Sequence, residues 1–208
     1  MSDNSPETQR LLERARQGET SAVELLLDQH RAALRRMVDL RLDPALARRV
    51  DASDIVQEVM FEASRRLADY LKKPAMPFHL WLRQLAKDHV IDAHRRHRLA
   101  KRRSVDREQS ARPALPGDSS LDLAAQFLDQ ELTPASAAIR QEMQRRLETA
   151  LAGMDEDDRE MILMRHFEQM ANQEVAAMLN LTEAAASMRY LRALRRLRKF
   201  LTENDKKP

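Results

Sequence analysis

The sequence predicts an all-α protein made of two small helical domains. Only 3 of its 208 residues are glycine, and aromatic residues make up 4% of the chain. Alanine, leucine, methionine, arginine, glutamate and glutamine dominate, and all of them are strong helix formers. No run of alternating β-branched residues indicates a strand. We therefore expect helices joined by turns and by one longer linker.

The first helical pattern covers residues 6–42, where apolar residues recur at steps of three and four. Gly18 interrupts this pattern, so two helices are expected. Thr20 or Ser21 is expected to cap the second helix, because a hydroxyl can accept a hydrogen bond from its first turn. The Asp-Pro pair at 43–44 predicts a turn.

A further helix is expected to run to about Leu71, with Asp51 or Ser53 as its cap. Residues 72–77, KKPAMP, should leave the helix, since their two prolines cannot both lie in a helix interior. A long helix is expected from about Phe78 onward, ending in the basic sequence HRRHRLAKRR.

The second half of the chain begins with a predicted linker. The sequence SVDREQSARPALPGDSS is rich in serine and proline, and the acidic LDLAAQFLDQEL after it is a candidate short helix. Thr133-Pro134 predicts the cap and first turn of the next helix. Helices are expected to about residue 152 and over 156–168, 172–179 and 181–200. The predicted organisation is a domain over 1–103, a flexible linker over 104–133 and a domain over 134–208.

Charge and composition exclude several classes of protein. The net charge is only +3, but basic residues gather at 94–103 and 189–199 and acidic residues at 118–131 and 155–160. Two basic clusters indicate a polyanionic partner that is contacted at two places. There is no cysteine, no apolar signal sequence and no apolar run near the roughly 20 residues of a membrane span. We expect a soluble cytoplasmic protein with no membrane insertion.

The C-terminal sequence NQEVAAMLNLTEAAASMRYLRALRRLRKF predicts a helix-turn-helix. Asn180 tolerates the left-handed conformation that ends a helix, Leu181 can reach the core, and Thr182 can cap the next helix. On that helix one basic arc of roughly 80° and one apolar arc of about 120° are expected. The basic arc holds Arg189, Arg192, Arg196 and Lys199; the apolar arc holds Leu191, Leu194, Leu197 and Leu201. A solvated amphipathic helix, a membrane-surface helix and a coiled-coil helix remain open as alternatives.

In the N-terminal half, DIVQEVMFEASRRL places Asp54, Gln57 and Glu58 at positions i, i+3 and i+4, where they share one helix face. The apolar residues Ile55 and Val59 lie elsewhere on the helix. No histidine or third carboxylate joins this patch, so protein docking is a better hypothesis than metal binding or acid–base catalysis.

The block after it combines a basic, proline-containing loop with Phe78 and Trp81 on the following helix. Aromatic rings beside cations suit unstacked or single-stranded DNA. Trp81 has two interpretations, a core residue that supports the loop or a DNA contact. His89, His94 and His97 lack the acidic or thiol partners of a metal site, so no metal is expected.

Taken together, these motifs resemble bacterial sigma factors of the sigma-70 type, specifically the extracytoplasmic-function (ECF) group. DIVQEVMFEASRRL is similar to the polymerase-docking helix of that family, and FHLWLRQLAKDHVIDAHRR to its minus-ten and promoter-melting helix. The C-terminal helices resemble the fourth region of the family, which binds the minus-35 element. Ala184, Ala186 and Ser187 depart from the glycine, valine and lysine common there, and Gln169 replaces a frequent glycine.

The resemblance implies partners and roles. Asp54, Gln57 and Glu58 would contact the β′ coiled coil of core RNA polymerase, while the β flap and possible anti-sigma factors would be further partners. The linker would thread toward the active-site and RNA-exit channels. The candidate minus-ten contacts are Lys72, Lys73, Met76, Phe78, Trp81, Arg83, Lys87, His94, Arg95 and Arg96. The candidate minus-35 contacts are Thr182, Glu183, Ser187, Arg189, Arg192, Arg196 and Lys199.

The sequence-based hypothesis is therefore a promoter-specificity subunit that directs transcription initiation and helps to melt the promoter. No enzymatic activity, catalytic residue or cofactor is expected. The alternative is a stand-alone helix-turn-helix regulator, which would explain residues 172–201 but would leave the docking helix and the 72–97 block without a role.

Overall fold

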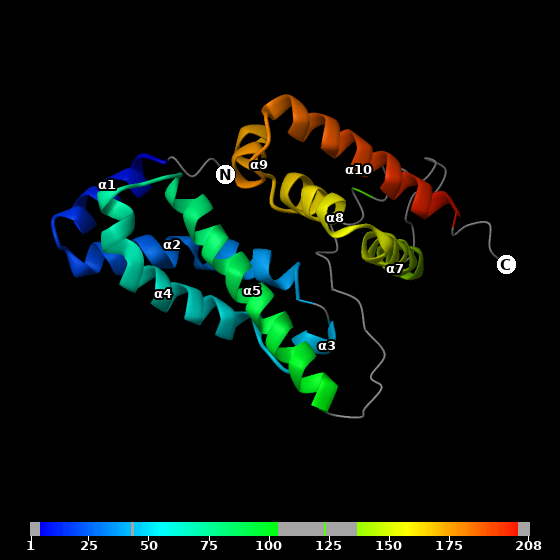
Figure 1. The fold of residues 1–208 in the computed structure, drawn as a ribbon, viewed down its shortest axis with the longest axis horizontal. Helices are drawn as coiled ribbons and strands as arrows, with labels where there is room; N and C mark the ends of the chain where they lie inside the picture. The colour runs from blue at the N-terminus through cyan, green and yellow to red at the C-terminus, as the bar shows by residue number, and fades with distance from the viewer. Residues whose placement is uncertain (1–4, 43, 104–122, 124–136, 204–208) are drawn as a thin grey trace. The chain divides into compact units, whose positions relative to one another are not determined.

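A computed structural model describes residues 5–42, 44–103, 123 and 137–203 of the chain. Every regular element among these described residues is helical, which confirms the predicted all-α class (Figure 1). The chain divides into two compact units. We call the described residues 5–103 the N-terminal unit and residues 137–203 the C-terminal unit, and each is described by itself.

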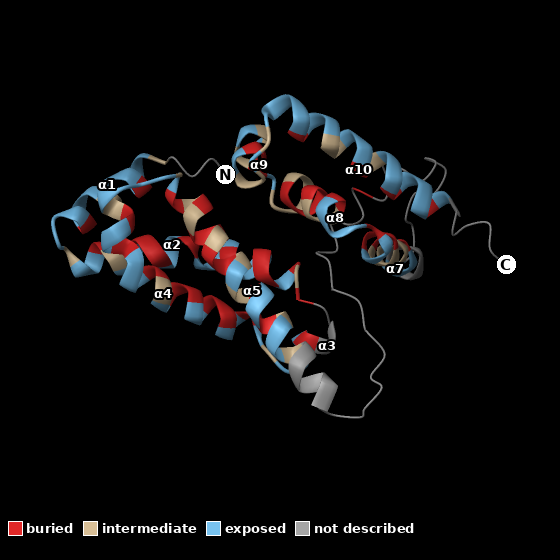
Figure 2. Ribbon diagram, viewed as in Figure 1, coloured by how far each residue is buried: buried red, intermediate tan, exposed pale blue. Residues whose placement is uncertain are grey.

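The N-terminal unit contains five helices around a single hydrophobic core. They are α1 (Pro6–Arg16), α2 (Thr20–Asp39), α3 (Pro44–Ala47), α4 (Ala52–Lys72) and α5 (Phe78–Arg103). Helix α2 packs on α1, α4 and α5, and α4 packs on α5. Each of the long helices buries one stripe and exposes the other, as Figure 2 shows. Leu26, Ile55, Val59 and Leu82 are among the fully buried side chains.

The helix starts in this unit depend on local side-chain chemistry. Asp51 caps α4 by accepting a hydrogen bond from the Ser53 backbone N–H at 2.7 Å, as expected. The predicted cap of α2 is wrong, because α2 starts after Glu19 and no side chain caps it. The Glu19 carboxylate instead accepts hydrogen bonds from Arg14 and the Ser21 hydroxyl, which lower the pKa of Glu19 to about 2. Thr20 therefore does not cap α2, and the Ser21 hydroxyl donates to the Glu19 carboxylate instead.

The turn expected at 43–44 is in part a helix, since α3 begins at Pro44. Proline is well placed at the start of a helix, where its missing N–H has no partner to lose. The loop expected over 72–77 is confirmed except that Lys72 still belongs to α4.

The C-terminal unit contains α7 (Ala137–Gly153), α8 (Glu156–Ile162), the π-helical turn η1 (Leu163–Phe167), α9 (Asn172–Met178) and α10 (Glu183–Glu203). Leu147, Met161, Ile162, Met164 and Leu197 are fully buried in it. The cap predicted at 133–134 and most of the candidate short helix at 121–132 lie outside the described residues. Within that candidate, Leu123 is helical and buried.

The helix predicted over 156–168 differs from the observed one in its last turn. After Ile162 the backbone widens into η1, where the Glu168 N–H donates to the Leu163 carbonyl at 2.9 Å. Gln169 then adopts a left-handed conformation with φ 53°, and the Met170 N–H donates to the Met164 carbonyl at 2.9 Å. The chain thereby reverses toward α9 without leaving these helix-end carbonyls unsatisfied.

Candidate nucleic-acid interface

The helix-turn-helix predicted from the sequence is formed by α9 and α10. Asn180 adopts the left-handed conformation with φ 52°, and the Leu181 N–H donates to the Ala176 carbonyl at 2.8 Å. The Thr182 hydroxyl accepts a hydrogen bond from the Ala185 N–H at 3.1 Å and so caps α10. The Asn172 side chain donates to the Glu183 carbonyl at 2.9 Å, which joins the starts of α9 and α10.

The faces of α10 differ in part from the predicted arcs. Ala186, Ala193, Leu197 and Leu201 are buried, and Leu194 is half-buried. Leu191, which was expected on the buried face, is 47% exposed, so that expectation is wrong. The two alanines bring the helix close to its neighbours on one side. The buried stripe is therefore centred on Ala193 and Leu197 and not on Leu191.

Arg189 and Arg196 were expected to contact DNA, but both bind aspartates of the same unit. Arg189 forms an ion pair with Asp157, and Arg196 forms ion pairs with Asp155, at 2.8 Å, and with Asp158. The Asp158 side chain is only 6% exposed. Helix α8 begins at these aspartates, and their negative charges favour a helix N-terminus. In this structure, therefore, these two arginines tie α10 to α8.

The outward surface of α10 carries the remaining candidates. Thr182, Glu183, Ser187, Arg192 and Lys199 are all exposed. Met188, Leu191, Arg195 and Arg198 are also exposed on this helix, although the sequence did not indicate them as DNA contacts. The small residues Ala186 and Ala193 could have indicated their exposure from the sequence, because small residues mark the side of a helix that packs closest to its neighbours. With that side as the reference, Arg195 and Arg198 both face outward.

The predicted docking patch is present on α4. Asp54, Gln57 and Glu58 are exposed, while Ile55 and Val59 are buried on the other side of the helix. This arrangement confirms the face predicted from helical spacing. Its function as a docking surface stays a prediction.

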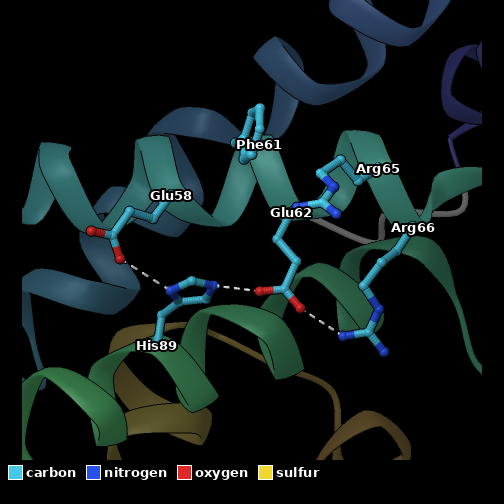
Figure 3. Close-up of a pocket in the computed structure, with 6 residues that line it drawn as sticks. All are labelled: Glu58, Phe61, Glu62, Arg65, Arg66 and His89. Atoms are coloured by element: carbon cyan, nitrogen blue, oxygen red, sulfur yellow. Dashed lines mark hydrogen bonds and ion pairs between the residues drawn. The ribbon is translucent and has the colours of Figure 1, made fainter.

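Glu58 also takes part in a bridge between α4 and α5 that the sequence did not predict (Figure 3). The His89 ring lies between two carboxylates, with Nδ1 3.3 Å from Glu58 and Nε2 2.7 Å from Glu62. Arg66 donates to Glu62 at 2.7 Å, and Arg96 lies 3.6 Å from Glu58. Hydrogen bonds from Arg66 and then from His89 lower the pKa of Glu62. The docking patch and a candidate DNA contact, Arg96, are therefore electrostatically joined.

The loop before α5 rests on a cluster of aromatic rings. Trp81 stacks on Tyr70 with ring centroids 4.7 Å apart, and Phe78 meets both rings. The Tyr70 hydroxyl donates to the Met76 carbonyl at 2.9 Å and so holds the loop. Trp81 is half-buried against the core, which agrees with the interpretation that it supports the loop.

Two of the candidate minus-ten residues are corrected by their burial. The Phe78 side chain is 3% exposed and Arg83 is 6% exposed, so neither side chain is available to DNA in this conformation. His94 uses Nε2 to contact the Arg41 carbonyl at 3.0 Å, and Lys87 is half-buried. The exposed candidates are Lys72, Lys73, Arg95 and Arg96, and Met76 is half-buried.

Within the described residues, no three histidine, aspartate or glutamate side chains are arranged to hold a metal ion. None of the helices in the described ranges is both long and apolar enough to cross a membrane.

These features define a helical protein with a helix-turn-helix unit and a separate unit that exposes a polar patch beside a basic loop. Two family models match the chain, "Sigma-70 region 2" over residues 23–100 and "Sigma-70, region 4" over residues 144–197. Together they span well over half of the sequence. The chain belongs to the sigma-70 family of RNA polymerase sigma factors, which are transcription initiation factors rather than enzymes.

The chain is also similar to individual sigma factors. The chain is 35% identical over 161 residues to a protein named a probable RNA polymerase sigma factor, RfaY, from Xanthomonas campestris pv. campestris. That match covers 76% of this chain but only 36% of RfaY, so the chain spans about a third of that relative's length. It is 26% identical to the RNA polymerase sigma-H factor of Pseudomonas aeruginosa over 93% of each chain.

Solved structures share the fold. The structure of CnrH in complex with the cytosolic domain of CnrY matches with a TM-score of 0.60 at 22% identity, covering 95% of this chain and 98% of that one. The Bartonella quintana sigma factor RpoE, solved with the anti-sigma factor NepR, matches with a TM-score of 0.57 at 18% identity over 86% of this chain and 96% of that one.

Proposed function

We propose that this chain is an ECF-type sigma factor, which binds core RNA polymerase and directs it to promoters with a minus-ten and a minus-35 element. The observation that carries this proposal is the presence of region 2 and region 4 in one chain, in that order, each on its own compact unit. A stand-alone helix-turn-helix regulator would need only the C-terminal unit. It would leave the region 2 match without a role.

The N-terminal unit is proposed to dock on polymerase and to read the minus-ten element. Asp54, Gln57 and Glu58 present exposed polar groups from one rigid helix, as a contact with the β′ coiled coil would require. Lys72 at the end of α4 and Lys73 in the loop after it, with Arg95 on α5, offer exposed positive charge for phosphates of the opened DNA. The aromatic cluster keeps that loop in place through the Tyr70 hydrogen bond to Met76.

The C-terminal unit is proposed to bind the minus-35 duplex through α10 and to contact the β flap. The first residues of a recognition helix meet base edges, and later ones approach the backbone. Ser187 and Arg192 are exposed in the first half of α10, and Lys199 is exposed in the second. Residues 104–133 are proposed to link the two units, so that binding by one raises the effective concentration of the other.

Regulation by an anti-sigma factor is a further part of the proposal. Two structures of similar fold, CnrH and RpoE, were solved with CnrY and with the anti-sigma factor NepR. We propose that this chain acts in the cytoplasm, where core polymerase and promoters are found.

Two measurements test the function. Tagged protein should retain core polymerase in a pull-down, and the reconstituted holoenzyme should start run-off transcription from promoters selected in a random library. The regulator alternative would be supported if the protein failed to bind core yet bound a palindromic duplex by itself.

A further inference from the structure

The side of α10 that points away from its own unit is not uniformly basic. Opposite the buried Ala193 and Leu197 runs a stripe made of Ala184, Met188 and Leu191, continued by Arg195. Met188 is 54% exposed and Leu191 is 47% exposed. Large apolar side chains in consecutive turns of one exposed stripe suggest a surface that is covered when the protein functions.

Positive charge surrounds this apolar pair. Arg192 lies beside Leu191, and Arg195, Arg198 and Lys199 follow in the next turns, all of them exposed. Arg189 and Arg196, which pair with aspartates of α8, lie at the flank of the buried side. The net positive charge of α10 is therefore presented on the same side as Met188 and Leu191. This combination favours a polyanionic occupant over an apolar protein groove.

The major groove of DNA contains one apolar group, the 5-methyl group of thymine, and alkyl side chains contact it directly. Met188 and Leu191 lie within the first nine residues of α10, the half of a recognition helix that meets base edges. Three residues of helix rise about 4.5 Å, close to the roughly 3.4 Å between base pairs. Two such side chains can therefore reach neighbouring base pairs.

We propose that Met188 and Leu191 read thymine methyl groups in the minus-35 element. The inference rests on the proposed function, because it requires α10 to enter a DNA duplex. It assigns a chemical class to the contacted bases. At the positions that face the first half of α10, one or two neighbouring base pairs carry thymine, and their methyl groups contribute directly to affinity.

The test removes only the methyl group. In a promoter selected by the holoenzyme, each thymine of the minus-35 element is replaced in turn by deoxyuridine, which keeps every hydrogen-bonding group. Binding of the holoenzyme is then measured by fluorescence anisotropy. We expect about four-fold weaker binding at one or two neighbouring positions, the equivalent of burying one methyl group, and no change at the others.

Variants connect that penalty to the two side chains. In Leu191→Ala or Met188→Ala holoenzyme, the deoxyuridine penalty at the matching position should disappear, because the partner of the methyl group is already gone. Arg192→Ala should weaken binding overall yet keep the penalty. Leu25→Ala removes an equally exposed leucine, 55% exposed on α2, and should leave both affinity and penalty unchanged.

The possible results distinguish a failure of the methyl contact from a failure of the proposed function. If the holoenzyme selects no minus-35 sequence, the proposed function itself fails. If it selects one and deoxyuridine is tolerated everywhere, or the penalty persists in both alanine variants, only the methyl contact is overturned. Weaker binding of Leu191→Ala to core polymerase, with DNA selectivity unchanged, would show that the stripe meets protein and would also overturn the inference.

Discussion

At the scale of single residues, the arginines of α10 are alike in sequence but not in role. Arg189 and Arg196 pair with aspartates at the start of α8, whereas Arg192 and Arg195 are exposed on the part of the helix surface that lies farther from α8. The difference follows from their angle to the buried stripe. Only arginines at its edge can reach the neighbouring helix.

Replacing Arg196 should destabilise the C-terminal unit. Asp158, with a side chain only 6% exposed, would lose its ion-pair partner, so Arg196→Ala should cost about 1–3 kcal/mol of unfolding free energy. Urea unfolding followed by circular dichroism measures this loss. Arg195→Ala is the matched control and should stay within about 0.5 kcal/mol. Equal losses in the two variants would contradict the structural role of Arg196.

The backbone conformation of Gln169 should lower the stability of the C-terminal unit. Its φ of 53° is unfavourable for a side chain with a Cβ atom, whereas glycine accepts it freely. Gln169→Gly should therefore raise the unfolding free energy by roughly 1 kcal/mol in the same urea experiment. Asn180→Gly is the comparison, with a smaller gain because asparagine tolerates this conformation. A stability loss in Gln169→Gly would count against strain at this turn.

At the scale of elements, α4 has two surfaces with separate tasks. Ile55 and Val59 pack in the core, and Asp54 and Gln57 face outward. Helical spacing predicted this division. It did not predict that Glu58 and Glu62 hold His89 of α5, a residue 31 and 27 positions later in the chain.

Substitutions in the patch should separate docking from stability. Gln57→Ala together with Glu58→Ala should weaken core binding by roughly five-fold or more, equivalent to at least about 1 kcal/mol. Because Glu58 also contacts His89, the single variant Gln57→Ala measures the contribution to core binding without disturbing that contact. Titration of labelled protein with core polymerase provides the affinity. Gln29→Ala, an exposed glutamine on α2, serves as control, and unchanged affinity in both patch variants would remove the docking role.

The bridge between α4 and α5 should make the fold sensitive to acid. Arg66 and His89 hold the pKa of Glu62 below its ordinary value of 4.5, so its carboxylate stabilises the folded state above that pH. This contribution is lost as the pH falls through the lowered pKa. Glu62→Gln should therefore flatten the decline of melting temperature below about pH 4.5. Glu24→Gln, exposed on α2, should keep the decline of the parent protein; identical curves for both variants would contradict the effect.

At the scale of the whole molecule, the two units match different regions of one family. Each has its own buried core, with Leu26 and Val59 in one and Leu147 and Met161 in the other. A covalent connection between the two units should increase promoter affinity most when the minus-ten and minus-35 elements are bound at the same time.

Cutting that connection tests its contribution. A protease site inserted after Gly117 would lie in the predicted linker, outside the described residues 5–103 and 137–203, and would allow the chain to be cut between them. Run-off transcription should fall by at least about ten-fold after cleavage at low protein concentration and recover as the concentration of both units is raised. The uncut insertion variant is the control. Full activity after cleavage at low concentration would show that the connection is dispensable.

The sequence by itself determined the helical class, the positions of most helices and the turn at Asn180, because these depend on propensity, spacing and caps within a few residues of each other. Only the tertiary structure decided that Phe78 and Arg83 are buried and that Leu191 is exposed. Spacing sorts side chains into arcs, but the neighbouring helices decide which arc is covered. The ion pairs of Arg189 and Arg196 likewise join residues 32 to 41 positions apart, a distance over which local pattern carries no information.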